Sequence, residues 1–115
     1  MAGIHNFDLR QGDTWNTIIT LAQDGSAINL TGYSATLQMR PSVDSDTKLL
    51  DLTTDNGGLV VATPANGQIQ INASAATMAA IARGVYPYEL QITSGTGIRT
   101  TMLAGYVTLT REVAR

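Results

Sequence analysis

The 115-residue sequence contains no cysteine, which excludes disulfides, zinc–thiolate sites and thiol nucleophiles. That absence fits a protein made in a reducing cytosol. His5 is its only histidine, so a site that needs two histidines would have to be shared between chains. Charged residues are also scarce, at 14%, whereas about 25% is usual in soluble domains. The formal net charge of -2 is weak, and its sign is wrong for binding driven by nucleic-acid phosphates. We therefore expect no nucleic-acid partner.

Long apolar runs are missing too. The opening MAGIHNFDLR has no extended apolar stretch, so we expect no signal peptide. No window approaches the roughly 18 apolar residues of a membrane span, so we expect no membrane partner. Nothing resembling a linker or an internal repeat divides the chain, and its length suits one core. We predict a single domain over residues 1–115.

Alternation of apolar and polar residues with a period of two dominates the chain and predicts strands. A first strand ends at Arg10, and TWNTIITLAQ places Trp15, Thr17, Ile19 and Leu21 on one face. Asp24-Gly25 is typical of a hairpin turn. YSATLQMR, residues 33–40, alternates most regularly, and Pro41 ends it. Further strands are predicted over residues 48–54, 59–63, 68–74, 85–93 and 98–113, the last with a bulge at Gly105.

The period changes in SAATMAAIARG, which predicts one short helix near residues 74–82. Ser74 can cap its start, Met78, Ile81 and Ala82 would share one face, and Gly84 fits its exit. Short strands 8 to 12 residues apart favour a β-sandwich over a parallel α/β fold.

The fold class predicted is therefore all-β, an immunoglobulin-like sandwich of seven or eight antiparallel strands. Such sandwiches often place a tyrosine at the start of the strand after the crossover, with its hydroxyl bonded to nearby backbone. Tyr86 or Tyr88 could fill that role. The alternative, equally open from the sequence, is that both are ordinary half-buried strand aromatics.

RQGDTW, residues 10–15, is the most chemically crowded stretch. Trp15 could stack on a ligand, with Arg10 and Asp13 as polar anchors. The stronger interpretation is structural: Gln11-Gly12-Asp13 is typical of a turn, and the phase of Trp15 points it into the core.

No catalytic, cofactor or metal site is predicted. His5 lies near an end, where an exposed side chain is expected. Asp44, Asp46, Asp51 and Asp55 could hold calcium, but without the EF-hand glycine and closing glutamate a solvated loop is favoured. Glu89 has no partner carboxylate at a dependable spacing. The glycine turns are too short to cradle phosphate. We predict that the protein is not an enzyme.

The order of motifs resembles a known group. FDLRQGDTWNTIITLAQDGSAINLTGYSATLQMR resembles the opening of small structural proteins of tailed bacteriophages and prophages, and GVYPYELQI and LAGYVTLTREV resemble their later strands. These proteins are similar to the immunoglobulin-like amino-terminal domain of phage baseplate upper proteins. Because those proteins continue into a stalk, we expect this chain to act as a free-standing adaptor or decoration subunit.

The resemblance implies a virion protein made in the bacterial host cytoplasm and located at the tail, baseplate or a fibre attachment point. Its expected partners are other virion proteins and further copies of itself, through strand edges or the terminal segments MAGIHN and TREVAR. Two alternatives stay open: a capsid decoration protein, and a carbohydrate- or receptor-binding module. An exposed row of Trp15, Tyr33 and Tyr106 would favour the module.

Overall fold

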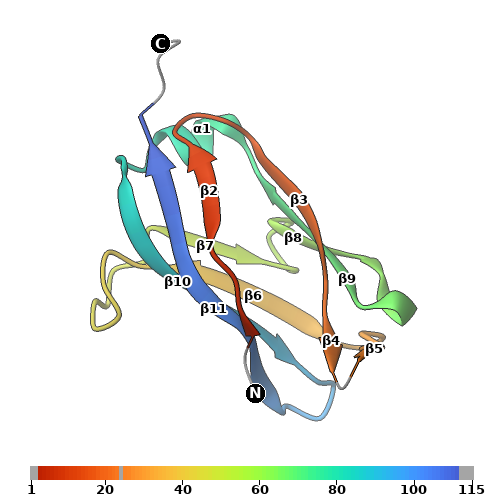
Figure 1. The fold of residues 1–115 in the computed structure, drawn as a ribbon. Helices are drawn as coiled ribbons and strands as arrows, with labels where there is room; N and C mark the ends of the chain where they lie inside the picture. Colours follow the sequence, from red (N-terminus) through yellow and green to blue (C-terminus); the bar gives the residue numbers. More distant parts are fainter. Residues whose placement is uncertain (1–2, 24, 112–115) are drawn as a thin grey trace.

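Two β-sheets make up most of the computed structural model, which describes residues 3–23 and 25–111 (Figure 1). Sheet A has the order β1-β11-β10-β6-β7, and β2 also pairs with β11. Its strands are β1 Gly3–Ile4, β2 Phe7–Arg10, β6 Ser34–Met39, β7 Leu50–Thr53, β10 Gly84–Thr93 and β11 Arg99–Thr110. Sheet B has the order β3-β9-β8, with β3 Trp15–Thr20, β8 Leu59–Thr63 and β9 Gln68–Ala73.

The core lies between the two sheets because each strand turns alternate side chains inward. On β6 the buried residues are Ala35, Leu37 and Met39, as the alternation predicted. Sheet B contributes Trp15, Ile69, Ile71 and others to the same cluster. The predicted phase of Trp15 is therefore confirmed, since its side chain is only 1% exposed.

The strand order confirms an immunoglobulin-like sandwich. In that fold the second, fifth and fourth strands share one sheet, and the third, sixth and seventh share the other. Here β3-β9-β8 and β6-β10-β11 reproduce those two sets, and β7 extends the second. One detail departs from all-antiparallel pairing: β1 and β2 run parallel to β11. Alternation within a strand carries no information on the direction of its neighbour.

Shorter elements connect the strands. β4 Ala22–Gln23 and β5 Ser26–Ala27 pair antiparallel, as the hairpin prediction required, although Asp24 itself lies outside the described residues. The PANG turn contains a 3-10 helix, Pro64–Asn66. No helix in residues 3–23 and 25–111 is long and apolar enough to cross a membrane.

The predicted helix is present but shorter than expected. α1 spans Ala75–Ala79, and Ser74 Oγ accepts a hydrogen bond from the Thr77 N–H at 3.2 Å. Met78 and Ile81 are buried, whereas Ala82 is exposed. The prediction that Gly84 ends the helix was wrong, because the helix ends at Ala79 and Gly84 is the first residue of β10. A Cβ there would lie 2.9 Å from Tyr86 Oη, so glycine leaves room for that hydroxyl.

Tyr86 is the corner tyrosine. Its hydroxyl donates to the Ala82 carbonyl at 2.8 Å, at the crossover between the two sheets. Tyr88, two residues on, is 3% exposed, and its hydroxyl reaches the carbonyl of His5 at 2.5 Å. The two tyrosines thus fix different segments, one at the crossover and one near the amino terminus.

The bulge predicted at Gly105 lies elsewhere. The register between β10 and β11 shifts where Leu90 faces Leu103 and Gln91 faces Thr101, which leaves Met102 as the extra residue. Gly105 instead allows a close approach: a Cβ there would overlap the His5 carbonyl oxygen and lie 2.7 Å from Asn6 Oδ1.

Candidate interaction surface

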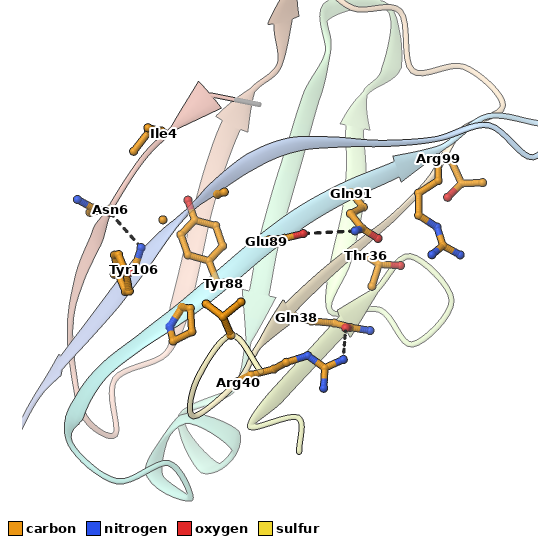
Figure 2. Close-up of a pocket in the computed structure, with 15 residues that line it drawn as sticks. Ile4, Asn6, Thr36, Gln38, Arg40, Tyr88, Glu89, Gln91, Arg99 and Tyr106 are labelled. Atoms are coloured by element: carbon orange, nitrogen blue, oxygen red, sulfur yellow. Dashed lines mark hydrogen bonds between the residues drawn. The ribbon is translucent and has the colours of Figure 1, made fainter. Parts of the chain in front are cut away.

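The outer face of sheet A carries a groove of about 750 Å³ (Figure 2). Its floor consists of the outward side chains of β6 and β10, which alternate with the core residues of the same strands. These floor residues are polar: Thr36, Gln38, Glu89, Gln91 and Thr93. Hydroxyl and amide groups on such a floor can donate and accept hydrogen bonds.

Three charged side chains line the groove: Arg40, Glu89 and Arg99. Arg40 is fixed by two hydrogen bonds, from Nη1 to the Ser45 carbonyl at 3.0 Å and from Nη2 to Gln38 Oε1 at 3.1 Å. The Glu89 carboxylate accepts a longer one from Gln91 Nε2 at 3.4 Å (Figure 2). The groove therefore presents both signs of charge, with Arg40 held in a defined orientation.

Large apolar side chains border these polar groups. Ile4, Val43 and Tyr106 line the groove and are 85%, 74% and 51% exposed. They come from the amino-terminal segment, the loop after β6, and β11. The groove thus combines a polar, hydrogen-bonding floor with exposed apolar side chains along its border.

The amino-terminal wall of the groove is fixed to sheet A. The His5 N–H donates to the Ala104 carbonyl at 3.0 Å, and the Tyr106 N–H donates to Asn6 Oδ1 at 3.0 Å. From the core side, the Tyr88 hydroxyl donates to the His5 carbonyl. Burial raises the pKa of Tyr88 to about 12, so this donor stays protonated at neutral pH.

RQGDTW forms a corner rather than a site. The Asp13 N–H donates to the Arg10 carbonyl at 3.1 Å, and Gly12 has a φ of 85°, which favours glycine. Gln11 Nε2 also donates a hydrogen bond to the Ile81 carbonyl at 3.0 Å, a contact that the sequence did not predict. The Trp15 ring packs edge-on against Phe7 at 5.1 Å between centroids. The ligand-binding interpretation of this hexapeptide is therefore wrong.

The other candidate residues do not come together. His5 is exposed, and its ring lies 4.5 Å from that of Phe7. Asp44, Asp46, Asp51 and Asp55 are all exposed, and Asp51 pairs with Lys48 at 3.7 Å. In the part of the chain that the structure describes, no three His, Asp or Glu side chains gather as metal ligands would.

The aromatic row also fails to form, because Trp15 is in the core and Tyr33 is half-buried. Of the terminal segments considered as docking arms, residues 1–2 and 112–115 lie outside the described residues.

Sequence reasoning missed Asn6 and Arg40 as members of one surface. Their separation in the chain hides their proximity, which follows from β11 lying between the amino-terminal segment and β10. The one available signal was the exposed phase of YSATLQMR, which ends in Arg40.

Comparison with known proteins gives similarity at the level of fold. No family of known sequences and no curated protein matches the chain. The N-terminal domain of phage TP901-1 ORF48 is similar in structure, with a TM-score of 0.59 and 13% identity, over 93% of this chain and 84% of that one. CopC from Methylosinus trichosporium OB3b has a TM-score of 0.51 and 10% identity, over 95% and 88% of the two chains. The chain is thus a structural neighbour of a phage protein domain, at identities that show the fold alone.

Proposed function

We propose that the protein is a structural component of the virion of a tailed phage or prophage. It assembles through protein–protein contacts at the tail, the baseplate or a fibre attachment point. The observation that carries this proposal is the likeness to the TP901-1 ORF48 domain, which extends over 93% of this chain. The ordered QGDT, LTGYSA and GVYPYELQI motifs support it independently, since they come from sequence alone.

The groove on sheet A supports an assembly role in physical terms. Its exposed Ile4, Val43 and Tyr106 supply apolar area, and Arg40 and Glu89 supply charges of both signs for pairing across an interface. The fixed position of Arg40 reduces the entropy lost when a partner binds. We propose this groove as the contact for another virion protein.

Of the two alternatives, the carbohydrate- or receptor-binding module lacks the observation that would favour it, because Trp15, Tyr33 and Tyr106 do not form an exposed row. Specific binding of the purified protein to one class of glycan on a glycan array would support that alternative. A capsid decoration protein would use the same chemistry at a different place in the particle.

Mass spectrometry of purified particles tests the proposal. We expect the chain in stoichiometric amounts, cross-linked to tail or baseplate proteins. Cross-links to capsid protein alone would instead establish the decoration role, and absence from the particles would contradict a virion role altogether.

A pair of variants tests the groove itself. Val43→Asp alters its rim, and Val60→Asp makes the same change at an exposed position on sheet B. The Val43→Asp variant should be missing from the purified particles, whereas the Val60→Asp variant should be incorporated normally. Equal incorporation would show that the groove is not the contact.

A further inference from the structure

The edges of the sheets are protected very unequally. An edge strand leaves a row of backbone N–H and C=O groups unpaired, and proteins usually block such rows with charges, bulges or short strands. At the edge of sheet A, β7 is blocked by Asn56. The Asn56 side chain donates to the Asp51 carbonyl at 2.9 Å and accepts from the Thr53 N–H at 3.0 Å. The outward Asp51 carbonyl and Thr53 N–H are thereby occupied, and the Lys48–Asp51 ion pair lies beside them.

Two further edges are blunted by irregularity. At the other side of sheet A, β1 and β2 are short segments separated by His5 and Asn6. In sheet B, the register of β8 against β9 shifts between Val61 and Thr63, so a bulge interrupts this edge.

β3 has none of these devices. It is six residues long, WNTIIT, without a charge, a proline or a register shift against β9. The Leu21 N–H donates to the Gly67 carbonyl at 2.8 Å, and this bond shows which residues of β3 turn their backbone groups toward β9. Residues 15, 17 and 19 therefore bond to β9, and the backbone groups of Asn16, Ile18 and Thr20 point to the open edge. In the described part of the chain, no other strand pairs with β3.

We propose that β3 pairs antiparallel with β3 of a second copy, across a two-fold axis through Ile18. In that register Ile18 faces its counterpart, and Asn16 faces Thr20 on both sides, so each pair exchanges two backbone hydrogen bonds. The absence of charge on β3 means that no like charges meet across the axis. The two sheets B become one continuous sheet, and the Ile18 side chains, each 57% exposed in the single copy, cover one another.

A second copy is favoured over an unrelated strand because the edge is self-complementary. Its outward positions read Asn, Ile, Thr, so a two-fold places apolar on apolar at the centre and polar on polar at both ends. This inference goes beyond the virion role and does not depend on it, since the test uses the isolated chain.

Single-cysteine variants test the geometry, because the chain has no thiol of its own. The Cα atoms of a hydrogen-bonded antiparallel pair lie about 5.5 Å apart, within the range that a disulfide spans. Under mild oxidation, Ile18→Cys should form a disulfide-linked dimer. The matched control is Val60→Cys, an exposed apolar position on β8 of the same sheet, and it should stay a monomer on a denaturing gel.

Light scattering tests the interface without cross-linking. The unaltered chain should be a dimer, and Ile18→Lys should raise the dissociation constant about tenfold or more, because two lysines would face each other. Val60→Lys should leave the dimer intact, and circular dichroism should show both variants folded. A monomer at every concentration, a dimer indifferent to Ile18→Lys, or a dimer broken by Val60→Lys would each overturn the proposal. A negative result would leave the virion role untouched.

Discussion

Tyr88→Phe removes the hydroxyl that joins the core of sheet A to the amino-terminal segment. In the folded chain this hydroxyl is buried and donates to the His5 carbonyl. A hydrogen bond of this kind stabilises by about 1 kcal/mol net. At pH 7 we therefore expect the variant to unfold with a free energy about 1 kcal/mol lower than that of the unaltered chain.

The same substitution changes the response to alkaline pH. The pKa of Tyr88 is raised from 10.0 to about 12 by burial, so the unfolded chain loses this proton before the folded chain does. The stability it contributes is complete below pH 10 and is lost as pH rises toward 12. With each pH unit between these values worth about 1.4 kcal/mol, the loss amounts to about 1.4 kcal/mol by pH 11. The gap between the two proteins should therefore close at that pH.

Urea unfolding at pH 7, 10 and 11 measures both effects. Tyr106→Phe removes a hydroxyl from a half-exposed ring and is the matched control, expected to change stability at pH 7 by less than about 0.5 kcal/mol. If the unaltered chain and Tyr88→Phe lost stability in parallel between pH 10 and 11, the reasoning about Tyr88 would be refuted.

Three further predictions concern the corners of the fold. Gly105→Ala should lower the thermal midpoint by several degrees, because the added Cβ overlaps the His5 carbonyl and must displace the amino-terminal segment; an unchanged midpoint would show that the approach is not tight. Tyr86→Phe should lower the free energy of unfolding by about 1 kcal/mol through the lost bond to Ala82, measured by chemical denaturation, and Gly84→Ala should do at least as much harm, since its Cβ crowds the same hydroxyl. Trp15→Ala should cost about 3 to 5 kcal/mol, enough to unfold much of the protein in a circular dichroism melt, whereas Arg10→Ala at the same corner should stay within about 0.5 kcal/mol.

The sequence predicted those features that depend on neighbouring residues. Period-two alternation placed Trp15 and the apolar residues of β6 in the core, and the serine before an alanine-rich run identified the start of α1. The tyrosine motif limited the corner tyrosine to Tyr86 or Tyr88. The structure identifies it as Tyr86, whose hydroxyl occupies the space that the missing side chain of Gly84 leaves. In each case the information lies within a few residues of the feature.

Features that join distant parts of the chain could not be predicted in this way. The approach of His5 to Gly105 and the parallel pairing of β2 with β11 depend on which strands become neighbours. The groove needs Asn6, Arg40 and Tyr106 on one face, and no local pattern relates them. The part that Asn56 plays at the edge of sheet A shows only in the structure, where its side-chain amide bonds to the Asp51 carbonyl and the Thr53 N–H.

The place of β11 in sheet A has a consequence for biosynthesis. β11 lies between β10 on one side and β1 and β2 on the other, so β1 and β2 have no partner until a strand about a hundred residues later has been synthesised (Figure 1). Until β11 leaves the ribosome, β10 has an unpaired edge and Phe7 has no strand to align it against the core. Pairings that span about a hundred residues close slowly because of the entropy of the intervening loop. In that interval the open edge of β10 is of the kind that pairs with a strand of another chain.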